Sequence, residues 1–198
     1  MFSINSLKRL EELKEEDYGY ISEVNIIGCN ANIFPEIIFE LFNLEILNIH
    51  SNNIEEIPDN FSNLPNLQEL ILDYNPIKIL PKSLTNCKNF NSLSCSDTKI
   101  EKLGKWMKKL TKLEYISLSN CNIKSIEFDI TKIHKVNITI NSYSNINNLS
   151  EKCEYLQFNY LLEPVNNLPI NLKKVKLFKP YEPINVKVPL NCKLFIVY

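Results

Sequence analysis

Apolar residues recur along this chain in a fixed order, with a period of about 23 positions. In the copy that begins at Leu44, apolar Leu47 and Ile49 stand on either side of polar Asn48 and are followed by Asn52. Alternation with a period of two predicts a short strand with one buried side. Each copy therefore contributes one strand. The clearest copies open at Leu44, Leu67, Phe90 and Leu113.

A proline follows the last apolar residue of the copy at Pro58 and again at Pro81. Proline fixes φ near −65° and has no amide donor, which suits a 3₁₀ or irregular segment better than a long helix. We expect these segments to return over the convex face of a solenoid and to cover the sheet from behind. Their inward residues are predicted to be Phe61, Leu64, Leu84 and Leu110.

The ninth position of each copy is small and polar, and we expect it to point inward at the sharp turn after the strand. Asparagine carries two donors and an acceptor, so it can satisfy backbone groups that would otherwise be buried at a cost of about 1 to 3 kcal/mol each. Threonine and cysteine do this less completely, which predicts a ladder that is weakest at its ends. The column reads Cys29, Asn52, Asn75, Thr98 and Cys121.

The register extends back to Ile21 and forward, with shorter copies, to the end of the chain. In the last part, Leu156 and Phe158 are matched to Val175 and Leu177, then to Phe195 and Val197, at spacings of about 19 and 20 residues. We therefore expect eight or nine parallel strands in an α/β solenoid with a concave sheet. Regular repeats should occupy residues 21–135 and irregular ones 136–198 of a repeat domain spanning 21–198.

Residues 1–20 are predicted to form an N-terminal capping helix. Ser6 can serve as the N-cap, Gly19 follows the helix, and an apolar stripe could cover the first strand. The alternative is a helix that docks into a groove on a partner. The stripe consists of Ile4, Leu7, Leu10 and Leu13.

The four regular copies, with Ile57-Pro58 and Leu80-Pro81 after the asparagine turn, resemble the intracellular 23-residue class of leucine-rich repeats. The segment from Phe158-Asn159 through Leu168-Pro169 is similar to the Phe-Asn-Ile-Pro (FNIP) repeats of social amoebae and giant DNA viruses. Together with the heavy use of Asn, Ile and Lys, the chain looks like a giant-virus leucine-rich-repeat protein. That resemblance implies a non-enzymatic scaffold or adaptor and supplies no ligand residues.

The composition of the chain excludes several classes of function. With 198 residues, 44% apolar content and a net charge of −1, the chain can bury one core and is too neutral for a dedicated nucleic-acid binder. Its 3 glycines are too far apart for a phosphate loop, and no metal-ligand spacing occurs, so we expect no cofactor and no metal. The charged N-terminus lacks the apolar run of a signal peptide or membrane span, so we expect a non-secreted protein of the cytoplasm, of a host cell if viral.

The cysteines fit a reduced intracellular chain. Cys29 and Cys121 belong to the turn column, Cys95 to a strand and Cys87 to the convex core. All four are predicted to point inward, where unpaired cysteine is common.

One row of the open face contains His50, Asp73, Ser96 and Ser119, which invites a hydrolase interpretation. The order is unsuitable, because a triad needs histidine between nucleophile and acid, and Ser96 should lie two strand spacings, ~10 Å, from His50. We expect polar lining, with His50 and Asp73 forming a hydrogen-bonded pair.

The same face mixes apolar and aromatic residues with polar ones, as protein interfaces do. We expect it to bind a protein or an extended peptide, although isolated surface isoleucine is also common. Ile27 lies in an outward column beside this set. The candidate partner-binding residues are Ile46, Asn48, His50, Ile71, Asp73, Tyr74, Ser94, Ser96 and Tyr115.

Two other surfaces carry open alternatives. Lysines around Trp106 form a basic convex patch that is either a solvated face or a dock for an acidic protein or membrane surface. The strand at 194–198 either pairs with a second copy to give a homodimer or is blunted by the loop containing Pro180, Pro183 and Pro189. The lysines are Lys99, Lys102, Lys105, Lys108, Lys109 and Lys112.

Overall fold

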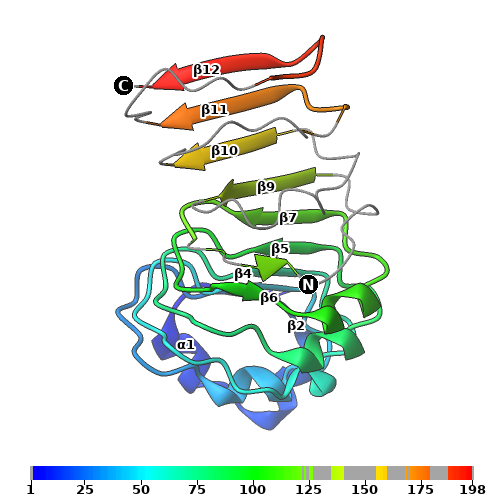
Figure 1. Ribbon diagram of the computed structural model, residues 1–198. Coiled ribbons are helices and arrows are strands. Elements are labelled where there is room, and N and C mark those ends of the chain that lie inside the picture. Colours follow the sequence, from blue (N-terminus) through cyan, green and yellow to red (C-terminus); the bar gives the residue numbers. More distant parts are fainter. Residues whose placement is uncertain are drawn as a thin grey trace.

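The computed structural model describes residues 2–121, 123, 125–126, 135–140, 155–159, 168, 170–178 and 187–197. Its strands form a parallel ten-stranded sheet and a separate pair, β6 with β8 (Figure 1). The large sheet follows chain order from β1 to β12, as a solenoid requires. Its strands are β1 (Phe2–Ile4), β2 (Ile21–Asn25), β3 (Ile46–Asn48), β4 (Glu69–Ile71), β5 (Ser92–Ser94), β7 (Tyr115–Leu118), β9 (Lys135–Ile140), β10 (Tyr155–Asn159), β11 (Lys174–Phe178) and β12 (Lys193–Val197); β6 is Lys102–Leu103 and β8 is Ser125–Ile126.

Short 3₁₀ segments cover the back of the sheet, which confirms the expectation drawn from the prolines. Pro35 is the N-cap of η2 and Pro81 the N-cap of η4. Phe61, at the start of η3, is fully buried. The segments are η1 (Glu15–Tyr20), η2 (Glu36–Glu40), η3 (Phe61–Asn63), η4 (Lys82–Asn86) and η5 (Lys105–Lys109).

Residues at the same position of successive repeats form columns across the sheet. Leu47 pairs with Leu70, Leu70 with Leu93, and Leu93 with Ile116. All four side chains are 0% exposed, so this column is the centre of one continuous apolar core. The strand residues on either side of the column are partly exposed and line the opposite, concave face.

Asn52 and Asn75 lie buried at the turns and connect each repeat to the one before it. Asn52 Oδ1 accepts from the backbone amides of Cys29 and Ala31, both at 3.0 Å, and its Nδ2 donates to Ile26 O at 2.6 Å. Asn75 Oδ1 accepts from Ile54 N at 3.1 Å, and its Nδ2 donates to Ile49 O at 2.9 Å. The predicted inward ladder is confirmed.

The hydrogen bonds of the ladder differ at the positions where threonine or cysteine replaces asparagine. Thr98 Oγ1 donates to Cys95 O of its own repeat at 2.8 Å, and it lies 3.2 Å from Cys121 Sγ. Cys121 Sγ donates to Cys95 O at 3.0 Å. At the other end Cys29 is only half-buried, so it does not point fully inward as expected. The Thr98 hydroxyl therefore bonds within its own repeat and contacts the next one, whereas the Cys121 thiol contacts Thr98 and Cys95 of the preceding repeat.

The N-terminal segment differs from the continuous helix expected over 1–20. The α-helix α1 spans only Leu7–Glu11, and β1 before it adds a strand to the edge of the sheet. Ser6 is the N-cap, accepting from Arg9 N at 3.2 Å, and Leu10 is fully buried. The helix stops early because the side chain of Asp17 accepts from Lys14 N at 3.1 Å and starts η1, a local bond that competes with continued helix.

The C-terminal strands repeat every 19 residues. Leu156 pairs with Val175, and Val175 with Leu194. The expected match of the last copy, at Phe195 and Val197, is therefore wrong by one residue, because buried Val175 and Leu177 pair with Leu194 and Ile196. Cys153, Pro180 and Pro183 lie outside the described residues.

We predict that replacing Asn75 by alanine lowers the free energy of unfolding by about 2 to 3 kcal/mol, because the buried amide of Ile54 loses its acceptor and Ile49 O loses one of its two donors. Asn53→Ala, at the neighbouring exposed position, is the matched control and should cost a few tenths of a kcal/mol. Urea unfolding followed by circular dichroism measures both. Equal losses for the two variants would show that the ladder does not stabilise the fold.

Candidate functional site

The concave face is the side of the sheet whose side chains point away from the core. Ile46 and Asn48 belong to β3, Ile71 to β4, Ser94 to β5 and Tyr115 to β7. The register places them in two adjacent columns, one through Ile46 and Tyr115 and one through Asn48, Ile71 and Ser94. His50, Asp73, Ser96 and Tyr74 follow the ends of these strands.

Apolar or aromatic groups occur in both of these columns. Ile46, Ile71 and Tyr115 are half-buried, and Tyr74 is 55% exposed. Ile46 pairs with Glu23 on one side and Glu69 on the other, so carboxylates flank the apolar surface. The face can therefore contact an apolar group and a cation of a partner together.

Asp73 is held by the next repeat. Its carboxylate accepts from Ser94 Oγ at 2.8 Å and from the backbone amide of Ser96. Ser96 Oγ in turn lies 2.8 Å from Ser117 Oγ and accepts from Ser119 N at 3.2 Å. These side chains form one polar network that fixes the C-terminal half of the face.

The expected pair between His50 and Asp73 is wrong, because the Asp73 carboxylate turns toward β5. The His50 ring instead packs against Tyr74, with ring centroids 5.1 Å apart and planes at 58°. Its Nδ1 is buried and, among the residues that the structure describes, has no hydrogen-bond partner. The serines thus contact Asp73 directly, and the arrangement is not that of a triad.

The buried thiols are poorly suited to act as nucleophiles. Burial raises the pKa of Cys87 to about 12 and raises the pKa of Cys95 and of Cys121. A thiol with a raised pKa holds little thiolate at neutral pH. Within the described ranges, no group of three or more His, Cys, Asp or Glu side chains could hold a metal ion.

Tyr74 has an unusual backbone conformation. Its φ is +55°, and the same column has Gly28 at +62°, Ser51 at +57°, Asp97 at +54° and Asn120 at +57°. A left-handed residue is required at this sharp turn, which costs a tyrosine roughly 1 to 2 kcal/mol, whereas glycine adopts it freely and Asn and Asp adopt it more readily than other residues. The strain presents the Tyr74 ring at the rim of the concave face.

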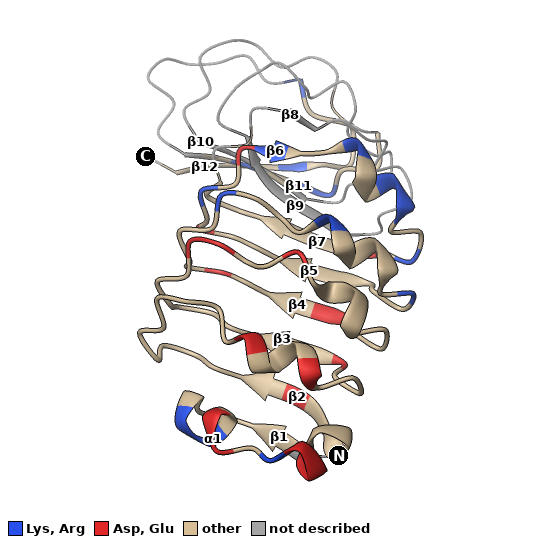
Figure 2. Ribbon diagram, turned by 90° about the horizontal axis from the view of Figure 1, so that it is seen from below, with Lys and Arg blue, Asp and Glu red and all other residues tan. Residues whose placement is uncertain are grey.

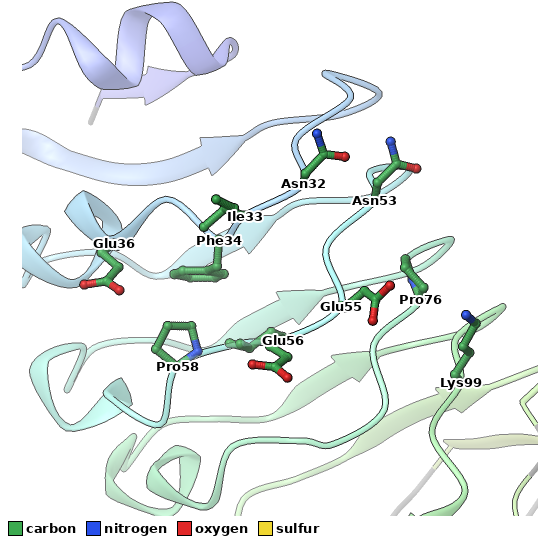
Figure 3. A pocket seen from close by; sticks show the side chains of 11 residues that line it. Asn32, Ile33, Phe34, Glu36, Asn53, Glu55, Glu56, Pro58, Pro76 and Lys99 are labelled. Atoms are coloured by element: carbon green, nitrogen blue, oxygen red, sulfur yellow. The ribbon is translucent and has the colours of Figure 1, made fainter.

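A groove of about 940 Å³ lies on the flank, where the chain leaves the turn (Figure 3). Glu36, Glu55 and Glu56 line it together with Ile33, which is 81% exposed. Glu55 binds Lys78 at 3.0 Å, and this contact and the nearby charge of Lys99 lower the Glu55 pKa. Sequence reasoning missed this groove, although Ile33 and Ile79 occupy the same repeat position and are both unburied.

The basic cluster around Trp106 is exposed at its lysines, and Trp106 is half-buried against the core. In Figure 2 the ribbon is blue, for Lys and Arg, mainly around β6, and red, for Asp and Glu, mainly around the earlier strands β2, β3 and β4. Lys112 Nζ donates to Asn89 Oδ1 at 2.6 Å.

The described residues contain no helix that is both long enough and apolar enough to span a lipid bilayer.

Two segments match leucine-rich-repeat family models: residues 31–77 match one described as Leucine rich repeat, and residues 112–133 match one described as Leucine Rich Repeat. No curated protein matches the chain. The fold defined by the parallel sheet, the asparagine turns and the 3₁₀ segments is a leucine-rich-repeat solenoid.

Solved structures show the same fold at low identity. A leucine-rich-repeat protein of Leptospira interrogans is 23% identical with a TM-score of 0.62, over 92% of this chain and 45% of that one. An internalin of Listeria monocytogenes, InlF, is 18% identical with a TM-score of 0.61, over 96% and 66%. The functional domain of InlJ from Listeria monocytogenes, which includes a cysteine ladder, is 17% identical with a TM-score of 0.65, over 86% and 40%. The chain spans less than two thirds of each.

We predict that Tyr74→Gly is more stable than Tyr74→Ala by about 1 kcal/mol, because both remove the ring but only glycine adopts a φ of +55° freely. Tyr20, which is 66% exposed and has no positive φ, is the matched site. There the glycine variant should be no more stable than the alanine variant. Thermal unfolding of the four variants measures these stabilities. If glycine were more stable than alanine at both sites, the backbone strain at Tyr74 would be contradicted.

Proposed function

We propose that this leucine-rich-repeat solenoid binds another protein, or an extended peptide, on its concave face. Leucine-rich-repeat domains are typically protein-interaction modules and are generally non-catalytic, and their extended surface suits a protein partner. The observation that carries the proposal is the uncovered column face, where Ile46, Ile71 and Tyr115 stay partly exposed among polar groups. Apolar groups surrounded by polar ones match the anatomy of an interface.

The geometry suggests how a partner is held. Tyr74 and Tyr115 offer large, stiff side chains, which are frequent hot spots. The Asp73 network keeps Ser94 and Ser96 in fixed positions, so little side-chain entropy is lost there on binding. Glu23 and Glu69, on either side of Ile46, favour a basic residue in the partner.

We predict that Tyr74→Ala combined with Tyr115→Ala weakens binding of the cellular partner at least tenfold. The partner is the protein of the source cell retained by the immobilised wild-type chain, and its affinity is then measured by surface plasmon resonance. Tyr20→Ala, another exposed tyrosine, is the control and should bind as the wild type does. If the double variant bound the partner as tightly as the wild type does, the binding site would not include these two tyrosines on the concave face.

A second candidate function is self-assembly through β12. Leu194, Phe195 and Ile196 are 38%, 43% and 45% exposed, so both faces of this strand are open. In the described residues β12 pairs on one side only, with β11, and an open apolar edge favours pairing with another copy.

For this candidate we predict a dimer by analytical ultracentrifugation that is lost in a chain ending at residue 193 and in Ile196→Lys. An edge dimer should persist at high salt, because its bonds are backbone and apolar. If the wild-type chain had the same sedimentation coefficient as the truncated chain, the dimer through β12 would be ruled out.

We also infer the setting. We base the proposal of FNIP-like repeats, and with it of an origin in a giant virus, on the sequence from Phe158-Asn159 through Leu168-Pro169. The buried Cys87 and Cys95, which are free cysteines, support a reducing compartment such as the cytoplasm.

A further inference from the structure

The charges of the regular repeats are separated along the solenoid. Residues 36–73 contain eight acidic residues and no Lys or Arg, whereas residues 78–112 contain nine lysines and two acidic residues. The net charge of the whole chain is only −1, because the acidic and basic segments nearly cancel. Along the regular repeats the ribbon in Figure 2 accordingly changes from mainly red near β3 and β4 to mainly blue near β6.

The division is ordered in the column that begins the 3₁₀ segments. At one position in successive repeats the chain carries Glu36, Asp59, Lys82 and Lys105. All four are exposed. If the same column is read backwards, each acid stands opposite a lysine. The column is thus complementary to a reversed copy of itself.

A second column has the same property about the same centre. It reads Glu40, Asn63, Asn86 and Lys109, and all four are exposed. Reversal places Glu40 opposite Lys109 and one asparagine opposite the other. The centre again falls between η3 and η4, which are neighbours.

A third column adds an apolar contact at each end. It runs from Ile37 in η2 to Trp106 in η5, and both side chains are half-buried against the core. Reversal places the isoleucine opposite the indole. Burying that pair removes apolar surface from water, and aromatic residues are enriched at interfaces.

We propose that the convex face binds a second copy of this chain, with η2 of each protomer against η5 of the other. Two convex faces can meet about a two-fold axis in two ways. An axis along the solenoid places acid against acid, whereas an axis parallel to the 3₁₀ segments, between η3 and η4, pairs Glu36 with Lys105 and Glu40 with Lys109. Only the second arrangement is attractive, and it closes as a dimer.

The charges at the ends are available for this contact. Glu36, Glu40, Lys105 and Lys109 form no ion pair within the described part of the chain. The carboxylate of Asp59 is less available to a partner, because its Oδ1 already accepts a hydrogen bond from Ser83 N at 2.7 Å. The flank column, Ile33, Glu56, Ile79 and Lys102, does not match its own reverse. The complementarity is therefore confined to the convex face.

The test is sedimentation velocity of the full chain. The wild type should form a dimer whose dissociation constant rises at least roughly tenfold when NaCl increases from about 50 to about 500 mM, because exposed pairs are screened. Glu36→Lys with Glu40→Lys gives two basic ends, and Lys105→Glu with Lys109→Glu gives two acidic ends. Each double variant alone should remain monomeric, and an equimolar mixture should form a dimer.

The chain with all four changes has the wild-type net charge and a reversed pattern, so it should dimerise again. Glu11→Lys with Glu15→Lys changes the same charge at exposed sites away from the convex columns, and the dimer should survive. Ile196→Lys should also leave it intact, which separates it from pairing through β12. A monomeric wild type at about 50 mM NaCl, or loss of the dimer in the Glu11 and Glu15 control, would overturn the proposal.

Discussion

The interaction on which this structure depends is the contact between a buried asparagine and the backbone of the preceding repeat. The chain turns sharply after each strand, and that turn removes several amides and carbonyls from water. Asn52 satisfies Cys29 N, Ala31 N and Ile26 O, and Asn75 satisfies Ile54 N and Ile49 O. Because Ile49 O accepts from both asparagines, each rung depends on the next. The apolar column supplies most of the burial, and the ladder makes it a solenoid with one repeat distance.

A fixed repeat distance has consequences for both faces. On the concave side it places equivalent side chains in rows, so that Asp73 can hold Ser94 and the Ser96 amide of the next repeat. On the convex side it aligns Glu36 and Lys105 in one column. Both proposed interfaces follow from this geometry. The concave interface depends on aligned apolar and aromatic side chains, and the convex interface depends on the order of charges along a column.

Much of the fold was predictable because its determinants are periodic. Three features repeat, so that one copy supports the assignment of the others. They are the strand column through Leu47, the 3₁₀ segments that follow Pro35, Pro58 and Pro81, and the inward Asn52. The end segments lack that support. Ser6 correctly marked a helix start, but the local bond of Asp17 that ends the helix has no counterpart in other repeats. In the last copy, consecutive apolar residues from Leu194 to Ile196 left two registers possible, and pairing with β11 selected the other one.

The candidate site was predictable as a set of columns but not as a set of bonds. The outward positions of Ile46, Ile71 and Tyr115 follow from alternation. The partner of Asp73 does not, because a side chain in a row can turn toward either neighbouring repeat, and the convergence of the Ser94 hydroxyl and the Ser96 amide decides the direction. The positive φ of Tyr74 was less evident, since it is signalled only by Gly28, Asp97 and Asn120 elsewhere in that column, which are residue types that adopt this conformation more readily.

The most direct test of the asparagine ladder is hydrogen exchange at single amides. The amides of Cys29, Ala31 and Ile54 lie outside the strands and donate to asparagine side chains at 3.0, 3.0 and 3.1 Å. If the ladder holds the repeats together, these amides exchange only when the solenoid opens, at rates close to those of the strand amides of Leu47 and Leu70. Exchange as fast as at an exposed, unbonded amide would contradict the account.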